Sequence, residues 1–459
     1  MLLGTVLKGW SPRPAGRFAR PAGFAALALL SSALSLSPAQ SAQTSFEPVV
    51  AATGIGAAAI AEFYDARGNT PIWLAAGQTE PAHRLMTLLA TSDLDGLRPA
   101  QFNIRALQQA VRRAESGDRA DVARADRMLS EAFLRYVAAL RRVGPSSEWQ
   151  FIDRAAAPPT PQVGILLRQA AATGSLNSFL DRMPWMHEGY SGLRSSLAEA
   201  LDRGDEAAAA RLRLNLDRIR LLPASGRYVL VNTAAQRLYM YEDGKVVDSM
   251  RVVVGKPTQP TPMMAAMIRY TAVNPYWNVP PDLAAERIAP NVVEQGVSYL
   301  KRQGYVVLSD WSDDATPVDP STIDWKAVAD GTTQIRVRQK PGPGNAMGRM
   351  KFMFPNKSGI YLHDTPNKEL LLEDARLFSG GCVRLEDAPR LAEWLYGEAL
   401  KVQKGGDPEQ HVDLEQPVPV YLAYLTAVPS DSSTVFYDDI YGRDQARLAA
   451  TNLGRVAAR

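Results

Sequence analysis

The sequence is short of cysteine and histidine. Its 459 residues contain one cysteine, Cys382, and four scattered histidines. A single cysteine excludes an internal disulfide and every zinc motif that needs a Cys-x-x-Cys pair. The histidines are too few and too widely separated to form a recognisable ligand set with it. We therefore expect no metal site.

The chain also lacks a strong excess of charge of either sign. Lysine and arginine number 51 and aspartate and glutamate 48, for a formal net charge of +3. Four of the cations, Lys8, Arg13, Arg17 and Arg20, lie in the first 21 residues, which contain no acid. Their removal would bring the net charge to −1, so we expect no nucleic-acid partner.

Long hydrophobic runs are missing too. The longest candidate, "GFAALALLSSALSLS", follows the basic N-terminus and has the length of the apolar region of a signal peptide. It is too short and too rich in serine for a comfortable membrane span. Small residues follow it, and we expect cleavage after Ala39 or Ala42. Residues 1–42 are therefore predicted to be a signal peptide on an exported chain, with an uncleaved N-terminal anchor as the alternative.

What is present is a globular chain in two parts. Residues 43–222 have helical spacing, as in the apolar stripe of Leu129, Phe133, Tyr136, Val137 and Leu140. The segment "RLRLNLDRIRLLP" alternates like a strand but also fits a helix, and we expect a helix. Residues 223–430 are β-rich, and 431–459 form a C-terminal tail. A helical domain followed by a mostly β domain predicts an α+β fold.

Turn and cap signals refine the β-rich part. Asp243 and Gly244 separate two strand-like runs, which predicts a two-residue hairpin. Further strands are predicted in "AMIRYTAV", "TQIRVRQ", "MKFMFP", "GIYLHD" and "QPVPVYLAYLTAV". After the cysteine, Asp387 is a candidate N-cap with Pro389 in the first turn of a helix.

An irregular insertion is expected at residues 284–343, with many acids and the run "KPGPG". Insertions of this length inside a sheet domain often cover a site. Tyr305, Trp311 and Trp325 are candidate walls of such a cap. The alternative is a solvated excursion without a role.

The chemistry centres on "FSGGCVRLED". A lone thiol in an exported chain is open to oxidation, which marks it as reactive unless it is buried and inert. His363 ends a predicted strand 19 residues before Cys382 and could take the thiol proton. Gly380 and Gly381 leave room for a substrate carbonyl and for backbone donors to an oxyanion. Ser379 could assist by hydrogen bonding or only shape the turn, and Arg384 could bind a carboxylate or staple the loop.

These residues resemble a known family. "YLHDTPNKELLLEDARLFSGGCVRLEDAPRLAEWL" resembles the active-site segment of the L,D-transpeptidases, whose YkuD-type pattern is a histidine followed by Ser-x-Gly-Cys-x-Arg or Asn. Many members have histidine where this chain has Gly380. "IAEFYDARGNTPIW" and "LATSDLDGLRPAQF" resemble the helical scaffold domain of the large periplasmic members, and "VFYDDIYGRD" their C-terminal end. The small peptidoglycan-binding domain that many large members carry has no counterpart here.

The resemblance implies a periplasmic enzyme that needs no cofactor. Cys382 would attack a tetrapeptide stem, release D-alanine with a proton from His363, and pass the acyl group to the amine of a neighbouring stem's third residue. Water, a free D-amino acid or a protein lysine could replace that acceptor, and a non-catalytic murein-binding scaffold is the other alternative. Partners would be peptidoglycan stem peptides and proteins of cell-wall synthesis. The resemblance adds the following residues to the predicted site: the Asp364 carbonyl as orienter of His363, and Trp277, Asn278 and Lys351 in the cleft.

Overall fold

The computed structural model describes residues 56–457, apart from 145–146, 160–161, 401–405 and 431–432. The predicted signal peptide, residues 1–42, lies outside the described residues. Within them, no helix has both the length and the apolar character that crossing a membrane requires.

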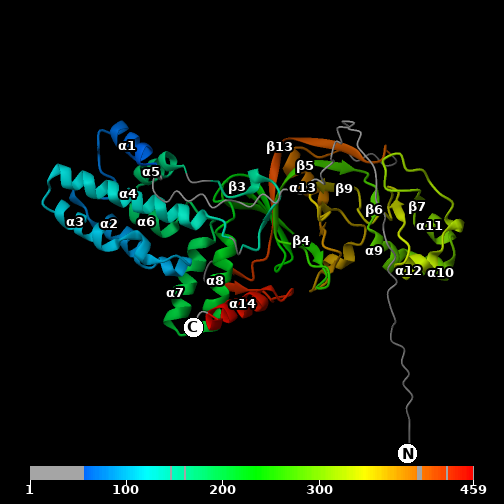
Figure 1. Cartoon of the computed structure of the whole chain (residues 1–459). Coiled ribbons are helices and arrows are strands. Elements are labelled where there is room, and N and C mark those ends of the chain that lie inside the picture. Colours follow the sequence, from blue (N-terminus) through cyan, green and yellow to red (C-terminus); the bar gives the residue numbers. More distant parts are fainter. Residues whose placement is uncertain (1–55, 145–146, 160–161, 401–405, 431–432, 458–459) are drawn as a thin grey trace, which may run out of the picture. The chain divides into compact units, whose positions relative to one another are not determined.

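The N-terminal part is helical, and Figure 1 shows α2, α3 and α4 packed side by side. Asp118 caps α4 by accepting hydrogen bonds from the N–H groups of Ala120 and Asp121. The apolar stripe predicted on α4 is buried over its whole length. The helical elements are α1 (Ala57–Ala66), η1 (Ala75–Gly77), α2 (Glu80–Ala90), η2 (Ser92–Asp95), η3 (Pro99–Phe102), α3 (Ile104–Ala114), α4 (Arg119–Arg141), η4 (Arg154–Ala156), α5 (Val163–Ala172), α6 (Leu176–Arg182), α7 (Tyr190–Asp202) and α8 (Glu206–Ile219).

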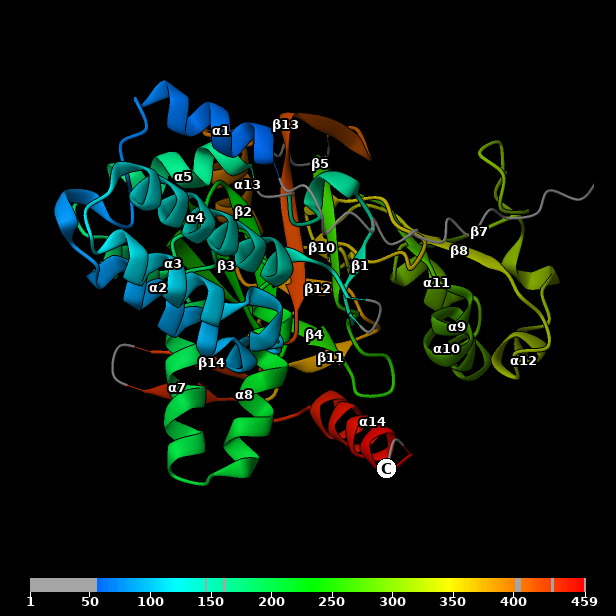
Figure 2. The ribbon, with the colours of Figure 1, turned by 60° about the vertical axis from the view of Figure 1, so that its left-hand side comes forward.

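The ambiguous segment before the β-rich part is the helix α8, as predicted, and Figure 2 shows it antiparallel to α7. Asp205 caps its first turn. Leu212, Leu216 and Ile219 are buried, because their spacing places them on the face that packs against the rest of the helical core. The fold is therefore α+β, as the sequence predicts.

The β-rich part is a ten-stranded sheet in which β5 pairs with both β13 and β9. The path β5-β13-β2-β3-β4-β12-β10-β9 thereby closes on itself as a barrel, with β1 and β11 attached at β5 and β4. Its strands are β1 (Gln150–Phe151), β2 (Tyr228–Asn232), β3 (Arg237–Glu242), β4 (Lys245–Gly255), β5 (Met264–Val273), β9 (Met350–Met353), β10 (Leu362–His363), β11 (Leu377–Ser379), β12 (Val383–Leu385) and β13 (Gln410–Ala423).

Two local sequence signals, a hairpin turn and a helix N-cap, form the predicted structures. Asp243 and Gly244 both have positive φ, at 48° and 78°, which is the backbone of a type I′ hairpin between β3 and β4. Asp387 accepts from the N–H of Arg390 and begins α13 (Ala388–Tyr396) immediately after β12. Both predictions are confirmed, and the short link from β12 to α13 anchors the C-terminal side of the cysteine loop.

The segment 284–343, called the cap segment below, is not irregular as the sequence suggested. With the preceding residues it has its own sheet, β6-β8-β7, and its own apolar core around Trp325 and Val337. Its short helices are spread between polar loops, and this arrangement hides their periodicity in the sequence. The elements are β6 (Trp277–Val279), α9 (Pro281–Leu283), η5 (Ala284–Ile288, a π-helical turn), α10 (Ala289–Gln295), α11 (Ser298–Arg302), β7 (Tyr305–Leu308), η6 (Pro320–Thr322), α12 (Trp325–Ala329) and β8 (Arg336–Gln339).

The C-terminal residues form a hairpin and a helix. The remaining elements are η7 (Lys368–Leu371), β14 (Ala427–Pro429), β15 (Thr434–Phe436) and α14 (Arg443–Ala457). β14 and β15 form a hairpin, and Asp444 at the start of α14 is only 5% exposed. This part of the predicted tail therefore belongs to a packed polar cluster, whose partners are described below.

A buried histidine makes the folded protein sensitive to acid. Burial, with the charge of Arg141 second, lowers the pKa of His187 from 6.5 to about 3. Between these values the unfolded chain binds a proton that the native protein excludes, so the free energy of unfolding falls as the pH drops below 6.5. Its contribution to the slope approaches about 1.4 kcal/mol per pH unit. We expect His187→Asn to have a shallower pH dependence of urea unfolding between pH 6.5 and 4, while His83→Asn, at an exposed site, follows the wild type. Equal slopes in all three proteins would contradict this account.

Candidate active site

Strand register brings the candidate residues to one face of the barrel wall. β10 runs parallel to β12 with His363 opposite Arg384, and antiparallel to β9 with His363 opposite Lys351. Alternate residues of a strand point to opposite faces. Leu362, Val383 and Leu385 therefore enter the apolar core, and Tyr361, His363, Cys382 and Arg384 line a cavity on the other face.

His363 is oriented by the backbone beside it. Its Nδ1 lies 2.5 Å from the carbonyl oxygen of Asp364. A carbonyl can only accept, so Nδ1 carries the proton and Nε2 is the basic nitrogen. The side chain is 2% exposed, and burial, with the charge of Arg384 second, lowers its pKa from 6.5 to about 3. The imidazole is therefore neutral at ordinary pH, and its Nε2 carries no proton.

Cys382 is partly exposed at the cavity wall, and its Sγ contacts the carbonyl of Gly359 at 3.5 Å. Burial raises the pKa of the thiol, and hydrogen bonds from Tyr361 and the charges of Lys351 and Arg384 oppose that rise. The resting pair is accordingly a neutral thiol and a neutral imidazole. Such a pair can form the thiolate as the proton moves to Nε2 during attack on a carbonyl carbon.

The loop before Cys382 is held by its own serine. The hydroxyl of Ser379 accepts from the N–H of Gly381 at 3.1 Å and donates to the carbonyl of Cys382 at 2.5 Å. Gly381 has φ of +113°, and a Cβ there would lie 3.0 Å from Ile360. A Cβ at Gly380 would face Gln259 and Leu283 of the cavity wall. Ser379 thus shapes the turn, and the Gly381 N–H has its partner inside the loop.

The cavity in front of the thiol has a volume of about 730 Å³. Cys382, His363, Ser379 and Gly380 form one side of it, and the cap segment contributes Arg287 and Tyr305 on another. Arg287 lies in the π-helical turn η5, and its charge lowers the pKa of Arg384, although burial is the larger cause. Two guanidinium groups facing one cavity favour an anionic ligand, and carboxylates are the anions that guanidinium binds with matched geometry.

The predicted cleft residues divide into two groups. Trp277 and Tyr305 line the cavity, with ring centroids 6.4 Å apart. Asn278 lies on the opposite face of β6 and accepts from Arg338, and Lys351 is covered by the ring of Tyr361, 4.5 Å from its Nζ. The carboxylate of Asp364 accepts from the Arg349 N–H and from Lys368. The last three side chains are not among those that line the cavity.

The other two aromatic candidates are not cavity walls in this structure. Trp311 is 57% exposed, and neither it nor Trp325 lines the cavity. Trp325 is buried in the core of the cap segment and donates its indole N–H to the carbonyl of Pro320. Trp325 therefore supports the cap from inside.

Among the cavity-lining residues that the sequence analysis did not identify, three bear on the chemistry. Tyr361 stands two residues before His363, and strand alternation alone places it on the same face. Arg287 has no local signal, because it reaches the cavity only through the fold of the cap segment. Gln259 lies in the "VVVGKPTQPTP" stretch, in the tight turn that follows β4. This turn requires glycine at position 255, because a Cβ on Gly255 would lie 2.3 Å from the Gln259 carbonyl oxygen. Among the described residues, no cluster of three or more His, Cys, Asp or Glu could hold a metal ion.

Comparisons with known proteins identify the family of the chain. Residues 226–420 match the model of the YkuD family, an L,D-transpeptidase catalytic domain, and residues 58–197 match a scaffold domain. A curated Haemophilus influenzae protein, whose name assigns it provisionally to the L,D-transpeptidases, is 30% identical over 338 residues, covering 71% of this chain and 68% of the relative.

Solved structures are more distant. An avibactam carbamoyl enzyme of Ldtfm is 17% identical with a TM-score of 0.22, covering 44% of this chain and 50% of that one. The L,D-transpeptidase from Mycobacterium smegmatis is 15% identical with a TM-score of 0.21, covering 43% of this chain and 58% of that one. This chain thus spans between half and two thirds of those proteins, and no argument below depends on them.

Proposed function

The chain belongs to the L,D-transpeptidase family, and we propose that it is a peptidoglycan L,D-transpeptidase that forms third-to-third cross-links through a thioester on Cys382. One observation carries the proposal. The only thiol of the sequence lies immediately before β12, and an oriented, neutral histidine ends the adjacent parallel strand β10. Both line one cavity, which two arginines also face. This combination supports acyl transfer from a substrate that carries carboxylates.

In the proposed first step, the sulfur of Cys382 attacks the carbonyl carbon that joins the third residue of a tetrapeptide stem to its terminal D-alanine. The thiol proton passes to Nε2 of His363 as the C–S bond forms. When the tetrahedral intermediate collapses, the C–N bond breaks and the imidazolium returns the proton to the departing amine of D-alanine. The product is a thioester between Cys382 and the tripeptide stem.

In the second step, the side-chain amine of a neighbouring stem's third residue attacks the thioester carbon. His363 takes the proton that the amine loses, an amide bond forms, the C–S bond breaks and the thiolate is protonated again. A thioester in water hydrolyses unless water is held off. We assign that task to the cap segment, whose Tyr305 and neighbouring Trp277 enclose the cavity.

The organisation of the chain fits export to the wall. We propose that residues 1–42 are a signal peptide, that 43–222 form the scaffold domain and 223–430 the catalytic domain, and that the mature protein acts in the periplasm. Its partners there would be stem peptides and proteins of cell-wall synthesis.

Product analysis tests the proposed reaction. We expect the purified protein and disaccharide-tetrapeptide to give free D-alanine and a dimer linked between two third residues, located by tandem mass spectrometry. Tripeptide without dimer would make the chain a carboxypeptidase. Incorporation of an added D-amino acid would indicate exchange, and a linked protein lysine an anchoring activity. Binding to sacculi without any product would leave a murein-binding scaffold protein.

The position of Arg287 in the cap segment predicts that its charge contributes to the affinity for the acyl donor. Arg287→Gln should lower kcat/KM for the tetrapeptide donor about tenfold, mainly through KM, because a charge-assisted hydrogen bond to carboxylate is lost. Arg302→Gln makes the same charge change on α11 but lies outside the cavity lining, and should behave as the wild type. Initial rates against donor concentration measure both. An equal effect of the two substitutions would show that only net charge matters.

A further inference from the structure

We propose that Thr261 is a positioning residue of the active site, which turns the Cys382 N–H into the cavity as the oxyanion donor. The proposal rests on the acyl transfer to Cys382 argued above. Thr261 is 0% exposed and lies outside the cavity lining, at the end of the tight turn that follows β4. Its role would therefore be exerted through the backbone of the cysteine loop.

The hydroxyl of Thr261 joins two backbone groups. Its oxygen accepts from the N–H of Gly255 at 2.9 Å and donates to the carbonyl of Gly381 at 2.8 Å. The carbonyl of Gly381 belongs to the peptide unit whose N–H is that of Cys382. In a trans peptide these two groups point in opposite directions. Because the Gly381 carbonyl points toward Thr261, the Cys382 N–H of the same peptide unit points away from Thr261.

The rest of the loop agrees with this orientation. The N–H of Gly381 is taken by Ser379, and the carbonyl of Cys382 accepts from the same hydroxyl. In the described part of the chain, the Cys382 N–H has no hydrogen-bond acceptor, although it adjoins the reactive sulfur. A donor without a partner at the nucleophile is what a developing oxyanion requires, and removing one such donor lowers catalytic rates by about 10²- to 10³-fold.

The C-terminal segment 441–444 contacts the backbone at Gly255 and Thr261. Arg443 donates to the carbonyl of Thr261 at 2.8 Å, and Tyr441 donates its hydroxyl to the carbonyl of Gly255 at 2.8 Å. These are the two residues that the Thr261 hydroxyl joins. Both ends of the turn from Gly255 to Thr261 are thus bonded to segment 441–444.

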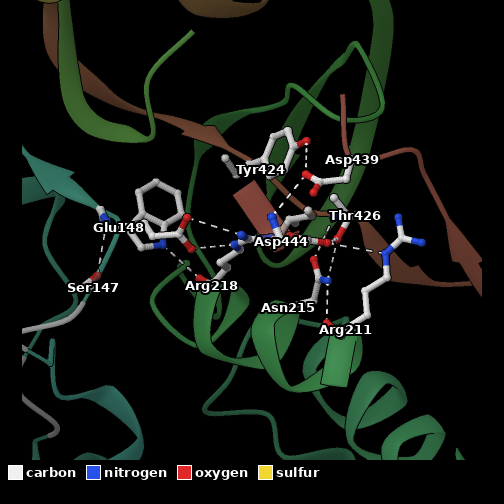
Figure 3. Close-up of polar contacts among 12 residues, drawn as sticks. Ser147, Glu148, Arg211, Asn215, Arg218, Tyr424, Thr426, Asp439 and Asp444 are labelled. Carbon is white, nitrogen blue, oxygen red and sulfur yellow. Dashed lines mark hydrogen bonds and ion pairs between the residues drawn. The ribbon is translucent and has the colours of Figure 1, made fainter. Parts of the chain in front are cut away.

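That segment is itself tied to the scaffold. Figure 3 shows Asp444 between Arg218 of α8 and Thr426, which bond its two carboxylate oxygens at 2.6 and 2.5 Å. Glu148 pairs with the other side of Arg218, and Asn215 of α8 holds Thr426 by two hydrogen bonds. Buried and partly buried polar contacts therefore link α8 to Asp444, and its chain neighbour Arg443 links this end of the chain to Thr261 and the nucleophile loop.

Acylation and alkylation of Cys382 together distinguish an effect of Thr261 on the oxyanion donor from a general effect on the structure of the loop. Acylation by a tetrapeptide donor or a carbapenem develops an oxyanion, whereas alkylation by iodoacetamide does not. We expect Thr261→Val, which removes only the hydroxyl function, to slow acylation at saturating donor by about 10- to 100-fold. KM and the alkylation rate should stay within about twofold of the wild type. Thr261→Ser should restore acylation to within about threefold.

The outcomes are distinct. A parallel loss of acylation and alkylation would show that the loop or the fold is disturbed, and would overturn the oxyanion role, as would unchanged acylation in Thr261→Val. A wild-type protein that forms no acyl-enzyme would overturn the proposed function, and this proposal with it. If Thr261→Val does not fold, Tyr441→Phe keeps the hydroxyl of Thr261 and loosens only its support. It should lower the ratio of acylation to alkylation about threefold, and an unchanged ratio would refute the proposal.

Discussion

Cys382→Ala is expected to abolish the covalent adduct that the wild-type protein forms with a carbapenem. Such a β-lactam resembles the acyl donor, and ring opening by the thiol would add its whole mass once per chain. Cys382 is the only cysteine of the sequence and faces the cavity, so no second thiol can replace it. Intact-mass spectrometry should show one adduct in the wild type and none in the variant. An adduct on Cys382→Ala, or none on a folded, active wild type, would contradict the assignment.

A matched substitution tests whether the thiol is needed as a nucleophile or only as a packing group. Cys382→Ser is close to the native side chain in shape but replaces the thiol by a much less acidic hydroxyl. His363, with its depressed pKa, is too weak a base to ionise it in the resting state. We expect acylation to fall by more than about 10³-fold with little change in melting temperature. Near-normal acylation of the serine variant would argue against thiol chemistry at this site.

His363→Ala should slow acylation of Cys382 by about 10²- to 10⁴-fold, because the group that accepts the thiol proton is gone. His411→Ala is the matched control, since His411 is exposed on β13 and does not line the cavity. The acylation rate constant at saturating donor should be unaffected in this control. Wild-type rates in His363→Ala would refute the pairing of the two residues.

The pH profile gives an independent test of His363. Because burial lowers its pKa to about 3, the imidazole remains an unprotonated base throughout the neutral range. The wild-type acylation rate should therefore show no inflection near pH 6.5 and should fall only as the pH approaches about 3. At the alkaline end the rate should rise, since burial raises the pKa of the thiol and the thiolate accumulates late. An acid limb with a midpoint between pH 6 and 7 would contradict this electrostatic description.

Much of the fold was predictable where one local signal decides an element. The Asp243-Gly244 hairpin, the Asp387 cap and the helix α8 each follow from a short stretch with its own turn, cap or period. The pairing of Cys382 with His363 needed one further assumption, that a strand end and a later loop meet in one sheet. The register of β10 with β12 brings both residues to the wall of one cavity, and the pairing itself stays a prediction.

What the sequence could not predict depends on contacts between distant residues. The cap segment was read as irregular because its short helices and strands have no period long enough to detect, although they share a core. Arg287 reaches the cavity only through that fold. Thr261 and Gly381 are 120 residues apart, and Arg443 lies 182 residues from Thr261, so no spacing rule links the nucleophile loop to the C-terminal segment.

The central claim is that Cys382 becomes acylated by a stem peptide. It is tested most directly by rapid-quench intact-mass spectrometry of the wild type and Cys382→Ala with disaccharide-tetrapeptide and no added acceptor. We predict a transient mass increase equal to the disaccharide-tripeptide acyl group, with one D-alanine released per adduct, in the wild type alone. Release of D-alanine by both proteins, or by neither although both are folded, would contradict the claim.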